Sequence, residues 1–378
     1  MKQLRPIRLL VDAHVFDDEF QGTRTFLKEI YTLLAHQEGI RLYLAAFDTE
    51  NLKKVFPASD NIVFLRYNSR SGWWRLLYEI PALIRRHKID YAHFQYITPP
   101  IKNCKWIVTI HDVIFKDYPE EFTPAYRLIK RLLFKISALR SDVLTTVSTF
   151  SKESIKKFLH TGQRPVYVIP NGVNPVFFEA HDPQEAKRTI AAKYGFDTFI
   201  LFVSRIEPRK NHISLLKTWL ELQLYREGCH LVFIGHKSIP VPELDKLLNQ
   251  LPPEIRQFIF ISADIDDKDL LGFYRAATLF VYPSKAEGFG IPPLEAAALK
   301  IPVLCSNTSA MKDYTFFGPN HFDPNDYDQF RQKLKAVLEN PPGPAFLSEV
   351  SDTIRREYSW ERSAKNLSDK IISPAREH

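Results

Sequence analysis

Two glutamates and several small residues stand together in the segment 282–295, YPSKAEGFGIPPLE. Glu287 and Glu295 are separated by seven residues, and both carboxylates can accept hydrogen bonds from hydroxyl groups. Gly288 and Gly290 carry no side chain, so an anion or a sugar hydroxyl can approach the main chain there. These residue types indicate recognition of a ligand that carries several hydroxyl groups.

The same segment predicts the beginning of a helix at Pro292 or Pro293, because proline is common in the first helical turn. The backbone N–H groups of Phe289, Gly290 and Ile291 would then have no partner inside the helix. A helix N-terminus with free N–H groups attracts anions. We therefore expect these three residues to contribute to ligand binding.

A second cluster, SRIEPRKN at residues 204–211, follows the apolar run 199–203. Arg205 and Lys210 bring two cations to the end of this predicted strand, where they would neutralise a diphosphate. Taken alone, the cluster could also be a charged surface loop. Combined with the helix N-terminus and the two carboxylates, it predicts a site for a sugar attached to a nucleoside diphosphate.

The first half of the chain offers weaker candidates, each placed just after an apolar run. Gly22 could contact a ligand or form a turn before a helix, and Ser148 could be a ligand or a helix cap. His111, beside an acid, is the stronger candidate, because an imidazole can be tuned for acid–base chemistry near neutral pH. A structural role for His111 is the alternative.

Apolar segments rich in Val, Ile and Phe alternate with helical patterns along the chain, which indicates an α/β fold with parallel sheets. Ligands in such sheets bind at the carboxyl ends of the strands, where all the candidates above fall. A turn-rich stretch around Asn171-Gly172 separates two series of strands, so two doubly wound domains facing a central cleft are expected. The predicted strands are residues 7–11, 42–46, 62–65, 91–94, 107–110, 143–147 and 166–169, then 199–203, 231–234, 258–261, 279–282 and 303–305.

Composition supports a folded, enzyme-sized protein of 378 residues with 45% hydrophobic and 25% charged residues. No apolar run reaches the roughly 20 residues of a membrane helix, so we expect a cytoplasmic protein. Three distant cysteines suggest neither a disulfide framework nor a zinc site. Of the net charge of +7, residues 1–180 carry +8, which points to an anionic partner of the first domain.

In these and further segments the chain resembles the family 4 glycosyltransferases, which are retaining enzymes with the GT-B fold of two Rossmann-like domains. The resemblance lies in LTTVSTFSKESI (144–155), VIPNGVNPVFF (168–178), FVSRIEPRKN (202–211) and the two-glutamate segment within residues 273–307. It also covers TIHDVIFKDYPEEF (109–122), a run most similar to bacterial surface-polysaccharide mannosyltransferases. GDP-mannose is therefore the first expectation for the donor, followed by UDP-hexoses.

The resemblance implies roles for individual residues. Arg205 and Lys210 would bind the donor diphosphate in place of a metal, so that no metal cofactor is required. Glu287 would contact the transferred sugar, and Glu295 the ribose. His111 would line the sugar pocket at the reacting carbon, with Gly22 nearby. The backbone of Gly288, Phe289, Gly290 and Ile291 would complete the donor site.

The resemblance also implies domain bounds: residues 1–175 on the acceptor side, residues 176–357 binding the nucleotide sugar, and a helix over 358–378 that crosses back onto the first domain. The sequence departs from the family pattern in its reduced first loop around Gln21-Gly22 and in Lys300, which stands where glycine is usual. The first departure leaves donor and acceptor contacts from that loop undecided.

Two other function classes remain as alternatives. A glycoside hydrolase also uses paired carboxylates, but it does not need Arg205 and Lys210. A nucleic-acid-binding protein would fit the basic charge, yet no nucleic-acid motif is present. Trp73 and Trp74, with the basic helix around Arg127 and Arg140, further predict peripheral contact with an anionic membrane near a lipid-linked acceptor. Tryptophans buried in the core are the alternative for this segment.

Overall fold

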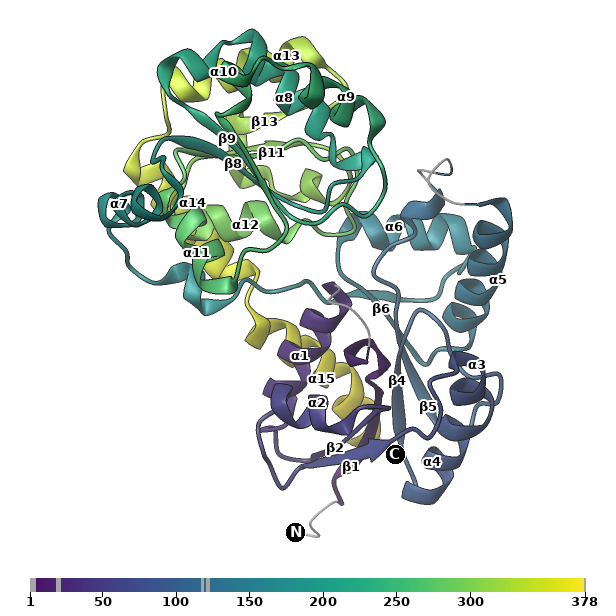
Figure 1. The fold of residues 1–378 in the computed structure, drawn as a ribbon. Coiled ribbons are helices and arrows are strands. Elements are labelled where there is room, and N and C mark those ends of the chain that lie inside the picture. The colour runs from purple at the N-terminus through teal and green to yellow at the C-terminus, as the bar shows by residue number, and fades with distance from the viewer. Residues whose placement is uncertain (1–4, 18–21, 117–118, 120–122, 377–378) are drawn as a thin grey trace. The chain divides into compact units, whose positions relative to one another are not determined.

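The computed structural model describes residues 5–17, 22–116, 119 and 123–376. They form two α/β units, one made of the chain up to Gly172 together with the last helix, the other of Val173–Ser359. Each unit contains its own parallel sheet, which confirms the predicted fold class (Figure 1). Gln21 and most of the YPEEF run, which the sequence comparison drew on, lie outside the described residues.

The first unit contains a sheet in the order β3-β2-β1-β4-β5-β6-β7. The reversal of strand order beside β1 is typical of doubly wound sheets. Every predicted strand of this unit is present, shifted by at most two residues at either end. The strands are β1 (Ile7–Asp12), β2 (Ile40–Ala46), β3 (Ile62–Arg66), β4 (Tyr91–Gln95), β5 (Lys105–Thr109), β6 (Val143–Thr146) and β7 (Val166–Val168).

Helices cover both faces of the first sheet, with α1 and α15 on one face and α4 and α5 on the other (Figure 1). Local caps set several helix starts: Asp48 accepts hydrogen bonds from two N–H groups of α2, and Ser148 caps α6. Ser148 is thus a helix cap, the alternative that the sequence left open. The helices are α1 (Gly22–Leu34), α2 (Thr49–Val55), α3 (Gly72–Trp74), α4 (Ile80–His87), α5 (Pro124–Arg140), α6 (Thr149–Leu159) and α15 (Trp360–Arg376).

The C-terminal helix α15 belongs to the first unit because it packs against α1. Its apolar stripe includes Trp360, Leu367 and Ile371, all of which are buried. Where the chain leaves the first unit, Gly172 lies directly against this helix: a Cβ at Gly172 would stand 2.5 Å from the backbone nitrogen of Trp360. Only a residue without a side chain fits this approach.

The second unit contains a parallel sheet in the order β10-β9-β8-β11-β12-β13. All five strands predicted in this part of the chain are present, and the two-residue strand β13 was not predicted. The strands are β8 (Phe199–Val203), β9 (His230–Ile234), β10 (Ile259–Ser262), β11 (Leu279–Tyr282), β12 (Val303–Ser306) and β13 (His321–Phe322).

Helices also cover both faces of this sheet, with α7, α11, α12 and α14 on one side and α8, α9 and α13 on the other (Figure 1). They are α7 (Pro183–Tyr194), α8 (His212–Glu221), α9 (Pro242–Gln250), α10 (Pro253–Arg256), α11 (Asp267–Ala276), α12 (Ile291–Ala298), α13 (Tyr327–Glu339) and α14 (Pro344–Glu357). Since β8 and β11 are neighbours, the loops after them meet at the carboxyl edge of the sheet. These loops hold most of the predicted site residues.

Candidate active site

The two loops that follow β8 and β11 are joined by backbone and side-chain contacts. The N–H of Lys285 donates to the carbonyl of Arg209 at 2.8 Å, and Asn211 Nδ2 donates to the carbonyl of Pro283 at 3.3 Å. A short 3₁₀ turn, Pro208–Lys210, sets the direction of the basic side chains. The cluster at residues 204–211 is therefore held in a defined conformation by the loop that carries the two-glutamate motif.

Lys210 and Glu287 form a buried ion pair at the centre of this arrangement. The Glu287 carboxylate also accepts hydrogen bonds from the Tyr282 hydroxyl at 2.8 Å and the Ser284 hydroxyl at 2.7 Å. Burial raises the pKa of Glu287, but the charges of Lys210 and Arg209 outweigh it and hold the pKa at about 2. Burial lowers the pKa of Lys210, and the Glu287 carboxylate opposes that effect. Glu287 is thus ionised and paired.

Arg209, which the sequence analysis did not select, belongs to the same network. Its guanidinium pairs with the buried Glu207 and lies 3.3 Å from Glu287 Oε2, and it donates to the carbonyl of Ala286 at 2.7 Å. Arg205, which was selected, is exposed, and its guanidinium has no partner among the described residues. The structure therefore brings Lys210 and Glu287 together and leaves Arg205 outside their network, open to a ligand.

The N-terminus of α12 has a glycine-containing turn of the kind found at anion-binding helix ends. Gly290 precedes the first helical residue, Ile291, with φ at +88°, in the left-handed region that favours glycine. The hydroxyl of Tyr314 donates to the carbonyl of Phe289 at 2.7 Å and so fixes the turn. In the described part of the chain, the N–H groups of Phe289, Gly290 and Ile291 have no backbone acceptor. Gly288 is buried within the same loop.

Glu295 lies on α12, one turn into the helix, and is partly buried. Its carboxylate accepts a hydrogen bond from the Tyr274 hydroxyl at 2.8 Å. Burial raises the pKa of Glu295 to about 7, while the hydrogen bond from Tyr274 acts in the opposite direction. Glu287 and Glu295 therefore differ in protonation near neutral pH, although they belong to one motif.

In the first unit, His111 follows β5 and is buried. Its Nε2 lies 2.8 Å from Gln95 Oε1, and Gln95 in turn contacts His93, which is hydrogen-bonded to Thr109 and Tyr31. Burial lowers the pKa of His111 to about 4, so the imidazole is neutral at pH 7. With Gln95 in this orientation, its amide oxygen can only accept a hydrogen bond, so the contact requires the His111 proton on Nε2.

The remaining first-unit candidate, Gly22, is the exposed first residue of α1. Its φ lies outside the left-handed region, and a Cβ at this position would meet no atom within 4 Å. The described structure thus shows no conformational need for glycine at position 22.

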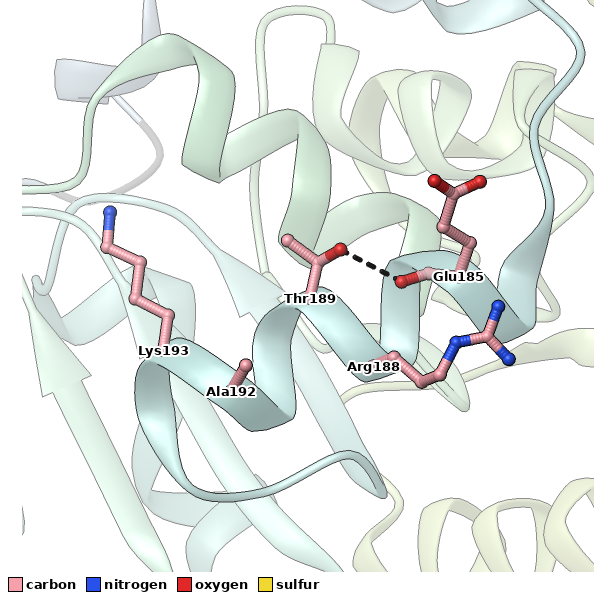
Figure 2. Close-up of a pocket in the computed structure, with 5 residues that line it drawn as sticks. All are labelled: Glu185, Arg188, Thr189, Ala192 and Lys193. Carbon is pink, nitrogen blue, oxygen red and sulfur yellow. Dashed lines mark hydrogen bonds between the residues drawn. The ribbon is translucent and has the colours of Figure 1, made fainter.

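A wide hollow on the second unit lies away from these residues. Glu185, Arg188, Thr189, Ala192 and Lys193 line it, all from α7 (Figure 2). The Thr189 hydroxyl donates a hydrogen bond to the carbonyl of Glu185, one turn earlier, at 2.9 Å, which is an ordinary contact within a helix. No predicted site residue contributes to this hollow.

In the described part of the chain, no group of three or more His, Cys, Asp or Glu side chains could hold a metal ion. Among the helices of the described ranges, none is long and apolar enough to cross a membrane.

An exposed face of the first unit combines apolar and basic side chains. Trp73 and Trp74 on α3 are 66% and 51% exposed, so the core role considered from the sequence is wrong for them. On α5, Leu128 is 69% exposed and Leu132 57%. We call these two segments, α3 with the following residues 75–79 and α5, the amphipathic face. Its large exposed apolar residues are Trp73, Trp74, Leu77, Tyr78, Tyr126, Leu128, Ile129, Leu132, Ile136 and Leu139.

Comparison with known proteins adds two family matches. Residues 21–177 match the model described as Glycosyltransferase Family 4, and residues 168–353 match that of Glycosyl transferases group 1. The second match contains the whole network around Lys210 and Glu287, together with α12. The first contains Gly22 and His111.

Individual relatives are distant. The O-antigen chain mannosyltransferase RfbU of Salmonella typhimurium is 26% identical over 62% of this chain and 61% of its own length. The O-antigen chain mannosyltransferase B of Escherichia coli is 26% identical over 86% of this chain and 88% of its own length. The chain thus spans less than two thirds of RfbU. Among solved structures, a sucrose-phosphate synthase of Thermosynechococcus elongatus superposes with a TM-score of 0.78 at 17% identity, covering 99% of this chain and 100% of that one.

Proposed function

Because this chain belongs to the family 4 glycosyltransferases and has their GT-B fold, we propose that it transfers a hexose from a nucleoside-diphosphate sugar to a saccharide or lipid-linked saccharide. The observation that carries this proposal is the loop pair after β8 and β11. There the Arg205 guanidinium, which has no partner in the described part of the chain, lies at the same sheet edge as a buried Lys–Glu pair and a glycine-capped helix N-terminus. A hydrolase would not need this collection of cationic groups.

In the proposed mechanism, the second unit binds the donor phosphates and stabilises the charge that develops on the leaving nucleotide. Arg205 and the N–H groups of Phe289, Gly290 and Ile291 are the groups open to the diphosphate. Lys210 adds positive potential, and Glu287 holds its ammonium in place. With this charge supplied by side chains, the reaction requires no metal. Transfer with retention of configuration is the stereochemistry we propose.

The proposed donor is GDP-mannose. This assignment is supported by the two relatives described above, whose names identify them as mannosyltransferases of O-antigen chains. By the same likeness, the proposed product belongs to a bacterial surface polysaccharide. His111 of the first unit and Glu295 are the proposed contacts for the sugar and the ribose hydroxyls.

A thermal-shift screen in EDTA with GDP-, UDP- and ADP-sugars tests the proposal, because a bound donor stabilises the folded protein by mass action. We expect GDP-mannose to raise the Tm most and to be consumed when an acceptor is present. Loss of the shift in EDTA would contradict the metal-free site. Sugar release without consumption of any nucleotide sugar would instead identify a glycoside hydrolase.

Donor binding should depend on pH through Glu295. A carboxylate accepts hydrogen bonds from two ribose hydroxyls, whereas a protonated carboxyl competes with them as a donor. With a pKa of about 7, Glu295 is roughly 10% ionised at pH 6, so donor affinity should fall about tenfold between pH 8 and pH 6. Calorimetric titration at several pH values measures this fall. Tyr274→Phe should move it to higher pH, and Glu295→Gln should abolish it.

The same group affects stability in the opposite sense. The pKa of Glu295 is raised from 4.5 in the unfolded chain to about 7 in the folded one, so the folded state binds a proton that the unfolded chain releases. Its contribution to the free energy of unfolding therefore falls as the pH rises from about 4.5 to 7 and is constant above that. Glu295→Gln should remove this decline in denaturant titrations.

We also propose that the amphipathic face holds the enzyme at an anionic membrane surface, near a lipid-linked acceptor. Basic side chains accompany its exposed apolar residues: Arg70, Arg85, Arg86 and Lys88 around α3 and α4, and Arg127, Lys130, Arg131, Lys135 and Arg140 on α5. Arg75 also belongs to this segment, but its side chain is only 14% exposed and pairs with Asp12. Aromatic and apolar groups interleaved with cations suit a lipid interface. Each cation near anionic lipid contributes about 1 kcal/mol.

Vesicle sedimentation measures this contact. Binding to anionic vesicles should weaken with salt and fall strongly when Arg127, Lys130, Arg131 and Lys135 become serine. The double variant Leu128→Ser, Leu132→Ser should also weaken binding to the vesicles, because it removes two apolar side chains that would contact the lipid. Lys187→Ser with Arg188→Ser on α7 serves as the control and should have no effect. Equal binding to neutral and anionic vesicles would contradict the proposed contact.

A further inference from the structure

A small pocket lies at the carboxyl edge of the first sheet, above the ends of β1, β2 and β3. It has a cavity volume of about 60 Å³, and a single water needs roughly 10–15 Å³ of such space. The pocket can therefore hold a group larger than water, such as a phosphate with part of its hydration. The residues that line it are His14, Asp17, Phe47, Tyr67, Ser69, Arg70 and Arg75, and we call it the arginine pocket.

The acidic groups in and below the pocket are already compensated. Asp12, buried beneath it, accepts a hydrogen bond from the Tyr67 hydroxyl at 3.0 Å and lies 3.1 Å from His14 Nδ1. The carboxylate of Asp17 accepts from the N–H groups of Phe47 and Asp48 at 2.9 and 2.8 Å. Neither carboxylate therefore directs its charge into the pocket unopposed.

The two arginines are only partly used by the protein. Arg75 lies with Nε 3.4 Å from Asp12 Oδ2, and its two terminal nitrogens have no acceptor among the described residues. Arg70 is exposed, and its Cζ lies 4.6 Å from the centroid of the Phe47 ring. It has no acidic partner in the described ranges. Two guanidinium groups thus line one pocket, and both have N–H donors without an acceptor among the described residues. Guanidinium groups bind phosphate oxygens in a bidentate manner.

The pocket lies at a position where a substrate is expected to bind. It lies at the carboxyl edge of the sheet that also carries His111, where doubly wound sheets bind ligands. Arg70 and Arg75 flank α3, so the pocket adjoins the amphipathic face in the same unit. A phosphate buried at this edge would belong to a molecule that the first unit recognises.

We propose that the arginine pocket binds a phosphate group carried by the acceptor substrate. This inference rests on the proposed function, because it assigns the phosphate to the second substrate of the transfer reaction. Arg75, fixed by Asp12, orients the phosphate, and Arg70 closes over it from the exposed side. An acceptor without a phosphate binds more weakly.

Calorimetry tests the proposal with mannose 1-phosphate, inorganic phosphate and methyl α-mannoside, in excess GDP to occupy the donor site. Arg70→Gln should weaken binding of mannose 1-phosphate on the order of tenfold or more, because it removes a charged hydrogen-bond donor. Arg66→Gln is the matched control: Arg66 is also exposed and lies 5.7 Å from the Phe47 ring, but it does not line the pocket. The control should bind like the unmodified protein.

A second variant, Ser69→Asp, places a carboxylate in the pocket and should abolish phosphate binding. Unchanged affinity in both Arg70→Gln and Ser69→Asp would overturn the phosphate site. Inorganic phosphate or methyl α-mannoside binding as tightly as mannose 1-phosphate would overturn its assignment to an acceptor. Failure of the proposed function looks different: no nucleotide sugar would be consumed, yet binding of the sugar phosphate would still depend on Arg70.

Discussion

Replacing Lys210 by alanine is expected to destabilise the second unit by about 3–5 kcal/mol and to remove most transferase activity. The stability loss follows from burial, because Glu287 would remain ionised in the core without its principal partner. The activity loss, about 100- to 1000-fold, is typical of removing one charge that stabilises a leaving group.

A double-mutant cycle separates the two effects. Lys210→Met combined with Glu287→Gln removes both charges and should recover much of the stability lost in either single variant. Activity should stay low, since the positive potential is gone. Denaturant titration gives the stabilities, and turnover at saturating donor gives the activity. A double variant with the sum of the two single losses would show that the pair does not couple.

Deleting residues 360–378 is expected to unfold the first unit, the largest effect predicted for this chain. The deletion exposes the α1 surface that Trp360, Leu367 and Ile371 cover. Each large apolar side chain lost from a core costs about 2–5 kcal/mol, and a whole domain has only about 5–15 kcal/mol of stability. Amide hydrogen exchange should show protection lost in β1 to β7 and kept in β8 to β12.

Point variants on α15 refine this test. Leu367→Ala should lower the free energy of unfolding by about 2–5 kcal/mol, because Leu367 is fully buried. Lys365→Ala on the same helix is the control, since its ion pair with Asp369 is exposed and contributes little. A truncated protein with native protection in the first unit would show that α15 is dispensable.

Much of the fold could be predicted because each buried strand is a run of apolar residues bounded by turn signals. The strand β13 was not predicted, because its two residues, His321 and Phe322, are too few to show a periodic pattern. At Lys300 the structure explains a feature of the sequence. Its φ is +61°, in the left-handed region, which explains why glycine is usual at this position in the family.

The site was only partly predictable, because local sequence does not reveal which partners tertiary structure supplies. Arg205, Arg209 and Lys210 share one short motif, yet only the last two reach Glu287. The near-neutral pKa of Glu295 depends on its burial in the folded chain and on Tyr274, which lies 21 residues away. The tryptophans of α3 could equally have been core residues, and only their exposure decides between the two interpretations.

The place of α15 in the first unit also bears on the order in which the chain folds during synthesis. The second unit ends at Ser359, so all of its residues are translated before α15. The first unit is begun earlier but lacks the helix that covers α1 until residues 360–376 have been translated. The α1 surface that α15 covers therefore stays without its partner until α15 has been made, so the first unit cannot become native before then.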